Sequence, residues 1–304
     1  MSNHETVAAM NRRELLRVGA ALPLALATSE PGAGLAVTST PPPYTLSINI
    51  EIMFPRAMSR GDRIRAVAAN GFKAYSFWSA PPEERAAMAK AQQDTGLTCV
   101  SLVGTGNAGG TTGFTRPGAK DALLAEFRER IAIARDFGTP DLISFVGQLQ
   151  NDVPWETQRA GIVDGLKRAG DLAALANVSI TVEPLSVNPG QPRRALDRAV
   201  DCFPVIKDVN HPHVKVCFDM YHLQRTEGNL VVNLRTGLEQ KLIKIVQIGD
   251  NPGRLEPGTG EINYAFIFKE LRRLGYSGYL DTEMGTSRTP EYAMDLARRM
   301  AEDN

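Results

Sequence analysis

The feature of this sequence that most constrains its fold is a regular alternation of short apolar runs with longer segments of helical spacing. Eight apolar or β-branched runs follow Tyr44, and between them lie segments such as 122–137 and 157–176, in which apolar residues recur every three or four positions. The runs are 46–53, 74–78, 98–103, 142–146, 178–182, 214–218, 243–248 and 279–282. Alternation of this kind predicts parallel strands with helices outside the sheet.

The length of the repeating part favours a closed barrel. Residues 44–304 are close to the roughly 250 residues typical of eight β-then-α units. We therefore predict one α/β domain over 44–304 with the (β/α)8 TIM-barrel fold. The alternative is an open, doubly wound sheet, which usually carries a GxGxxG motif after its first strand. Here the first run ends in the sequence EIMFP at 51–55, which lacks that motif.

The first forty residues differ in kind from the rest. A basic segment containing Arg12-Arg13 precedes a short apolar stretch, 18–27, which ends in small residues. This order is typical of a cleavable export signal, and the arginine pair resembles a twin-arginine signal. We expect residues 1–40 to be a signal peptide and linker and the mature protein to be exported, to the periplasm. The alternative is an amphipathic surface helix. Beyond residue 40 no run reaches the roughly 18 apolar residues needed to span a bilayer, so no membrane contact is expected after cleavage.

Charge and cysteine content exclude several classes of protein. The chain has 34 Lys and Arg against 34 Asp and Glu, with 43% hydrophobic residues, so it is neither disordered nor a basic nucleic-acid binder. The three cysteines, Cys99, Cys202 and Cys217, are far apart and form no CxxC pair. Neither a disulfide framework nor a thiolate zinc site is expected, and we predict that these cysteines are buried apolar residues.

Polar residues stand at the ends of four consecutive runs, the fifth to the eighth. They are Glu183, Asp219, Gln247 and Glu283. In a barrel of this type the active site lies at the carboxyl ends of the strands, which are about 4.8 Å apart, so these side chains can converge. Any one of them alone would more often be a helix cap or an ion-pair partner, but three crowded carboxylates repel one another unless a cation lies among them. An all-oxygen set favours one divalent ion, Mg²⁺ or Mn²⁺, over structural zinc.

A long motif carries a family resemblance. The stretch QIGDNPGRLEPGTGEINY occupies 247–264, and Glu183-Pro184, the DMYH sequence at 219–222 and the glycine-rich segment 104–113 precede it in order. Over 46–284 the sequence resembles the hydroxypyruvate isomerase group of the xylose isomerase-like sugar isomerases and epimerases. The resemblance implies that Glu183, Asp219, Gln247 and Glu283 bind the metal and that Glu183 and Glu283 also move protons. It further implies that His222 and Arg254 hold substrate oxygens and that Trp78 lines the sugar pocket.

Two positions depart from the pattern of that group. Ser76 stands within the second run, just before an aromatic pair, where the group commonly has a Glu, and Ser186 stands where an Asn is usual, although Asn188 follows closely. Because both positions belong to the pocket wall in the family, we expect the metal chemistry to be retained with a different substrate.

These observations predict a metal-dependent isomerase or epimerase of a small carbohydrate or hydroxycarbonyl compound, working through an enediolate. One alternative is a metal-dependent lyase that cleaves 3-keto-glycosides by β-elimination, and another is an exported sugar-binding protein without turnover. Apurinic endonucleases of the same superfamily use several histidines for three metals, whereas this chain has only His4, His211, His213 and His222. No nucleic-acid partner is expected, and the sequence leaves open whether the chain forms a homo-oligomer.

Overall fold

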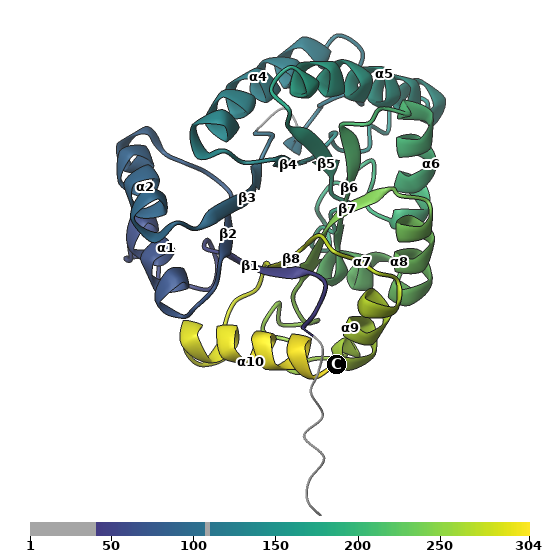
Figure 1. Ribbon diagram of the computed structural model, residues 1–304. Helices are drawn as coiled ribbons and strands as arrows, with labels where there is room; N and C mark the ends of the chain where they lie inside the picture. The colour runs from purple at the N-terminus through teal and green to yellow at the C-terminus, as the bar shows by residue number, and fades with distance from the viewer. Residues whose placement is uncertain (1–40, 107–109) are drawn as a thin grey trace, which may run out of the picture. The chain divides into compact units, whose positions relative to one another are not determined.

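The computed structural model describes residues 41–106 and 110–304, and Figure 1 shows a ring of strands surrounded by helices. Eight parallel strands close into a barrel in chain order, since β1 pairs with both β2 and β8. The strands are β1 (Thr45–Asn49), β2 (Ala74–Phe77), β3 (Thr98–Val103), β4 (Asp141–Ser144), β5 (Ser179–Val182), β6 (Val214–Asp219), β7 (Ile243–Ile248) and β8 (Tyr279–Thr282). The predicted (β/α)8 barrel is confirmed. The predicted export signal lies outside the described residues.

Helices follow the strands around the outside of the barrel. They are α1 (Arg60–Ala69), α2 (Pro82–Thr95), α4 (Lys120–Phe137), α5 (Trp155–Ala174), α6 (Ala199–Val209), α7 (Met220–Thr226), α8 (Leu230–Glu239), α9 (Tyr264–Arg273) and α10 (Pro290–Asp303). Two of these, α7 and α8, lie between β6 and β7, where the alternation predicts a single helical segment. None of the helices among the described residues is long and apolar enough to cross a membrane.

Helices pack apolar faces onto the barrel, and α5 is an example. In α5, the buried residues Ile162, Leu166, Ala169 and Ala173 are spaced three or four apart and therefore share one face. α5 also lies close to the segment between β3 and α4, because a Cβ added at Gly165 would lie 2.4 Å from the ring of Phe114. Cys99, Cys202 and Cys217 are free and buried, as the sequence predicts.

The first strand ends earlier than its apolar run suggests. β1 stops at Asn49, whose Oδ1 accepts a hydrogen bond from the backbone N–H of Glu51 at 3.0 Å and turns the chain. The Glu51 carboxylate then binds Arg60 at the start of α1 and accepts from the backbone N–H of Trp78 at 3.0 Å. The polar side chains at this turn set the end of the strand, and the end of the apolar run does not.

Strand register brings polar residues to the same level inside the barrel. Asp219 on β6 is aligned with Gln247 on β7, and Gln247 is aligned with Asp281 on β8. Because side chains alternate along a strand, Glu283 lies on the same face as Asp281 but one layer nearer the carboxyl end. The barrel therefore carries two successive polar layers at this end.

Candidate active site

The four strand-end residues are buried at the carboxyl end of the barrel. Glu183 and Glu283 directly follow the last residues of β5 and β8, whereas Asp219 and Gln247 lie within β6 and β7. The exposed fraction of each of these four residues is between 0% and 6%. The structure thus places all four residues at the same end of the barrel, away from bulk water.

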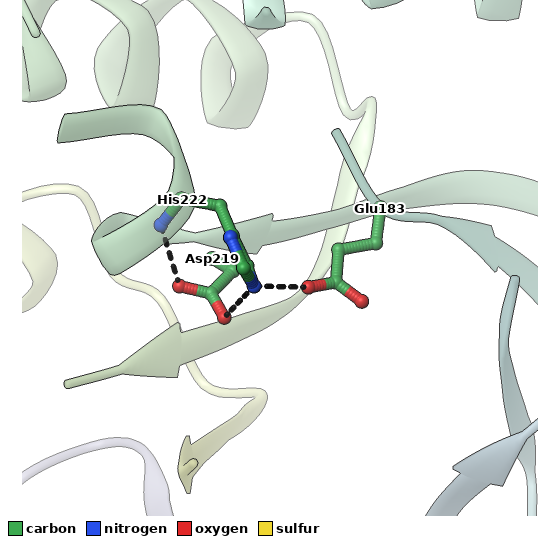
Figure 2. A group of neighbouring side chains, drawn as sticks. All are labelled: Glu183, Asp219 and His222. Atoms are coloured by element: carbon green, nitrogen blue, oxygen red, sulfur yellow. Dashed lines mark hydrogen bonds and ion pairs between the residues drawn. The ribbon is translucent and has the colours of Figure 1, made fainter. Parts of the chain in front are cut away.

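Glu183, Asp219 and His222 form one cluster, in which the potential ligand atoms all lie within 4.8 Å of one another (Figure 2). Nε2 of His222 is 3.5 Å from Oε1 of Glu183 and 3.8 Å from Oδ2 of Asp219. Asp219 also caps α7, because its Oδ1 accepts from the backbone N–H groups of Tyr221 at 2.7 Å and His222 at 3.2 Å. The cap fixes one carboxylate oxygen and leaves the other facing the cluster.

Glu283 is held by donors from three directions. Its Oε1 accepts from Nη2 of Arg254 at 2.8 Å and from Nε1 of Trp78 at 3.0 Å. Its Oε2 accepts from Nε2 of Gln247. Arg254 Nη2 is also 3.5 Å from Oδ2 of Asp219, so the guanidinium lies between two of the acidic side chains.

Gln247 lies beside this cluster, but its amide nitrogen rather than its oxygen faces Glu283. Nε2 also donates to Oδ2 of Asp281 at 3.1 Å, and Oε1 accepts from Sγ of Cys217 at 3.1 Å. In this orientation Gln247 acts as a hydrogen-bond donor to two carboxylates. A half-turn of the amide about its last side-chain bond exchanges nitrogen and oxygen and would present the oxygen that the sequence predicts as a ligand.

Arg254 reaches the site because its loop folds back on one buried side chain. Asp250 is fully buried, and its Oδ2 accepts from the backbone N–H groups of Gly258 at 2.8 Å and Gly260 at 2.9 Å. Its Oδ1 accepts from the N–H of Ile262 at 3.1 Å. This loop contains the most distinctive motif of the sequence, and its internal hydrogen bonds explain why Arg254 points inward instead of into solvent.

Electrostatics at the site favour a cation. Burial raises the pKa of the carboxyl groups of Glu183, Asp219 and Glu283, and the charges of Glu283 and Asp219 raise that of Glu183 further. Arg254 opposes the rise at all three. Burial, with the charge of Arg254, lowers the pKa of His222 to about 3, so this imidazole is neutral at pH 7. A divalent ion among the carboxylates would stabilise their ionised forms.

The residues present fit such an ion. Oε1 of Glu183 and Nε2 of His222 are buried and have no hydrogen-bond partner among the described residues. Buried polar atoms nearly always have partners, so two facing one another without one are typical of a site for a ligand. Carboxylate oxygens from Glu183, Asp219 and Glu283 suit Mg²⁺ or Mn²⁺. His222 can serve either as a further ligand or as a donor to a bound substrate.

A cavity of about 310 Å³ opens over this cluster. One side of it is formed by Glu183, Glu283, His222, Arg254 and Trp78. The remaining wall is apolar and consists of Val103, Ile143, Phe145 and Leu185. The site can therefore accept a small molecule that presents oxygens to one side and carbon atoms to the other.

Sequence reasoning missed the polar layer beneath the cavity. Asp281 is fully buried, accepts from Oγ of Ser76 at 2.9 Å, and shares the Gln247 amide with Glu283. Ser76 in turn accepts from Nδ2 of Asn49 at 3.1 Å. We expected Ser76 in the cavity wall, and this prediction is wrong: Ser76 supports the layer below the cavity. The alternation of side chains along β8 was the signal that could have found Asp281.

The second departure, Ser186, also lies outside the cavity wall. Its Oγ is 2.8 Å from Nδ1 of His222, on the side of the ring opposite the acidic cluster. His211 and His213 precede β6 at its amino end, away from this site.

Comparisons with known proteins agree with the barrel fold. The profile of the family described as xylose isomerase-like TIM barrel matches residues 64–303. A putative hydroxypyruvate isomerase of Mus musculus is 29% identical over 254 residues, covering 79% of this chain and 89% of the relative. A 2-oxo-tetronate isomerase of Cupriavidus necator is 30% identical over 226 residues, covering 73% and 85%.

Solved structures share the fold at lower identity. A family 2 AP endonuclease of Brucella melitensis has a TM-score of 0.72 at 23% identity, with 84% of this chain and 97% of that chain covered. A 3-keto-D-glucoside 4-epimerase of E. coli has a TM-score of 0.69 at 18% identity, with the same coverage. The IOLI protein, solved with a bound zinc atom, has a TM-score of 0.68 at 17% identity and coverage of 85% and 97%.

Proposed function

The chain belongs to the xylose isomerase-like TIM barrel family, and on that premise we propose that it is a divalent-metal-dependent isomerase or epimerase of a small sugar or hydroxycarbonyl compound. The observation that carries this proposal is the pair of buried glutamates, Glu183 and Glu283, that line one cavity together with His222 and Arg254. The curated relatives named as hydroxypyruvate and 2-oxo-tetronate isomerases support the same class of reaction.

The reaction begins with removal of a weakly acidic proton from a carbon beside a carbonyl group. A divalent ion held by Glu183, Asp219 and Glu283, with Gln247 as a fourth ligand after an amide turn, would supply Lewis-acid polarisation of the carbonyl. We propose Mg²⁺ or Mn²⁺ for this ion, because the acidic ligands are hard oxygens.

The two glutamates differ in how strongly they are held. Oε1 of Glu183 has no hydrogen-bond partner in the described part of the chain, whereas both oxygens of Glu283 accept hydrogen bonds. Glu183 is therefore the freer base for the first proton transfer, and Glu283 can return a proton from its own side of the cavity. His222 and Arg254 would bind substrate oxygens, and the positive charge of Arg254 would stabilise the enediolate as it forms.

Exchange of substrate hydrogen with solvent tests this proposal directly. Purified protein loaded with Mn²⁺ is incubated in heavy water with a panel of hydroxypyruvate, 2-oxo-tetronates, ketoses and 3-keto-glycosides. Deuterium at the carbon next to the carbonyl is expected for at least one compound, and Glu183→Gln should abolish it. Glu261→Gln, on an exposed loop, is the matched control. Absence of label across the whole panel with metal-loaded protein would reject the proposal.

A lyase acting on 3-keto-glycosides is the second candidate function. Removal of a proton beside a ketone also initiates β-elimination, and the apolar wall of Val103, Phe145 and Leu185 would suit an apolar leaving group. Release of the aglycone from a 3-keto-glycoside would indicate the lyase, whereas an isomeric product would indicate the isomerase. Tight sugar binding without any conversion would indicate a binding protein instead.

We also propose export through a twin-arginine-type signal within residues 1–40. The support is the order of basic, apolar and small residues in this segment. Mass spectrometry of the N-terminus of protein recovered from the periplasm tests it, with Arg12→Lys/Arg13→Lys as the variant that should remain uncleaved. Recovery of the full-length chain from the periplasm would contradict cleavage.

A further inference from the structure

Nδ1 of His222 begins a short chain of hydrogen bonds that passes through Ser186 and ends at Arg225. Oγ of Ser186 is 2.8 Å from Nδ1 of His222, and Nη1 of Arg225 donates to the same Oγ at 3.1 Å. Nη2 of Arg225 donates to Oδ1 of Asn188 at 3.1 Å. The guanidinium also lies over the ring of Tyr221, 5.4 Å from its centroid. Arg225 is thus fixed by three neighbours on the loop after β5 and on α7.

The direction of these bonds follows from the chemistry of the groups. A guanidinium can only donate, so Oγ of Ser186 accepts from Arg225. A hydroxyl that accepts from a cation is polarised and becomes a better donor of its own proton. The acceptor within reach is the lone pair of Nδ1 of His222, 2.8 Å away. Ser186 therefore donates to Nδ1, and the ring proton resides on Nε2.

The opposite side of the ring favours the same tautomer. Nε2 faces Oε1 of Glu183 at 3.5 Å and Oδ2 of Asp219 at 3.8 Å, and both are carboxylate oxygens. A lone pair on Nε2 would be repelled by these oxygens, whereas an N–H group is attracted to them or to a substrate oxygen placed between them.

We propose that Ser186 and Arg225 are positioning residues that hold His222 in its Nε2–H tautomer, so that His222 donates to a substrate oxygen and does not ligate the metal. This inference rests on the proposed function for the substrate oxygen, but the tautomer itself exists without substrate. It also gives a role to Ser186, which departs from the family pattern, and to Asn188, which follows it closely and accepts from Arg225. His222 as a metal ligand would require the opposite arrangement, with Nδ1–H donating to Ser186 and a lone pair on Nε2.

Nitrogen NMR of protein labelled with ¹⁵N-histidine tests the tautomer without any assay of activity. Long-range ¹H–¹⁵N correlations distinguish a protonated from an unprotonated ring nitrogen, and His222→Gln assigns the signals. The metal-free and Mg²⁺-loaded proteins are both expected to show the proton on Nε2. A proton on Nδ1 of the wild-type protein would overturn the proposal.

Variants test whether Ser186 and Arg225 set this tautomer. Ser186→Ala and Arg225→Ala are expected to give mixed tautomers, and Ser186→Thr, which keeps the hydroxyl, should restore Nε2–H. The matched control is Arg299→Ala, at an exposed ion pair with Asp295 on α10. An unchanged Nε2–H signal in both alanine variants would show that Ser186 and Arg225 do not set the tautomer of His222.

Metal affinity separates the two possible roles of His222. Loss of a hydrogen bond behind a true ligand weakens metal binding by roughly 10- to 100-fold. We expect the Mn²⁺ dissociation constant, measured by competition with a chelator, to be unchanged within about twofold in Ser186→Ala, while kcat/KM falls about tenfold, mainly through KM. A tenfold loss of Mn²⁺ affinity would assign His222 to the metal. Failure of the proposed reaction would remove only the kinetic arm, because the NMR and Mn²⁺ measurements need no substrate.

Discussion

Nη2 of Arg254 donates to Oε1 of Glu283 at 2.8 Å and thereby places a permanent positive charge inside a group of buried acids. The same nitrogen is 3.5 Å from Oδ2 of Asp219, so one guanidinium serves two carboxylates. Arg254 also lies over the ring of Tyr221, 5.1 Å from its centroid, which restricts its movement. Several predictions about charge at this site depend on that arrangement.

Replacing Arg254 should lower activity strongly. Arg254→Met removes a fixed charge from the place where negative charge develops, and the expected loss in kcat/KM is roughly 10²- to 10³-fold. Arg254→Lys keeps the charge without the planar donors and should recover part of the loss. Steady-state kinetics with the substrate found in the heavy-water panel provide the measurement, and Arg299→Met is the control. Activity of Arg254→Met within threefold of wild type would be inconsistent with this role.

The two glutamates should each be required for turnover. Glu183→Gln and Glu283→Gln keep the shape of the side chain but remove its basicity, and each should lower kcat by at least about a hundredfold. Exchange of label into substrate should be lost with Glu183→Gln. Near-normal turnover in either variant would reject proton transfer by that residue, and Glu261→Gln should behave like wild type.

Trp78 is expected to act through Glu283 as well as through the cavity wall. Trp78→Phe keeps an aromatic ring but removes the indole N–H that donates to Oε1 of Glu283 at 3.0 Å. We expect kcat/KM to fall by roughly fivefold to tenfold, the usual effect of one lost hydrogen bond, with little change in thermal stability. A change in stability without a change in kinetics would show that the indole is only a packing group.

Without metal, the protein should lose stability as the pH rises. Burial raises the pKa of Asp281 from 3.8 to about 7, and burial also raises the pKa values of Glu183, Asp219 and Glu283. A carboxyl group with a higher pKa in the folded state binds its proton more tightly when folded. Its contribution to stability is therefore complete below about pH 4 and is lost as the pH rises through about 7.

Urea unfolding in the presence of a chelator, from about pH 4.5 to about pH 8, measures this dependence. Asp281→Asn should have a weaker dependence on pH than wild type, because one of the titrating groups is gone. An increase in the unfolding free energy of the metal-free protein across this range would contradict the expected sign.

Addition of Mn²⁺ should stabilise the folded protein in a concentration-dependent manner. A ligand that binds only the folded state raises its stability by about 2.7 kcal/mol at a hundred times its dissociation constant. Differential scanning fluorimetry should show this shift for wild type and a much smaller one for Asp219→Asn. His211→Gln, at the amino end of β6, is the control, and an equal shift in Asp219→Asn would place the ion elsewhere.

Much of the fold could be predicted from the sequence because the apolar runs that form strands are local. The run at 243–248 coincides with β7, and the run at 279–282 coincides with β8. The first run was predicted too long, since its end is set by a polar turn around Asn49 and Glu51. The additional helix α7 was missed because it begins directly at the last strand residue, Asp219, which caps it.

The positions of the candidate ligands could be predicted for a related reason, because the carboxyl ends of the strands lie at one end of a parallel barrel. The contacts of Asp281 and Ser186 could not be predicted from the sequence, because they depend on strand register and on the path of a loop. Asp281 meets Gln247 through the alignment of β7 with β8, and Ser186 reaches His222 across the gap between a loop and a helix. The departures from the family pattern pointed to Ser76 and Ser186, but not to their hydrogen-bond partners, Asp281 and His222.

Beneath the cavity, the barrel interior is filled by Cys217 and Ile245 together with Asp281, and Ile143 of the cavity wall packs against the first two. Reactant and product must consequently exchange through the same opening, one after the other. Each therefore competes with the other for the vacant protein, and progress curves should slow well before equilibrium as product accumulates. Rapid removal of product by a following reaction would set the net direction in the compartment where the protein works.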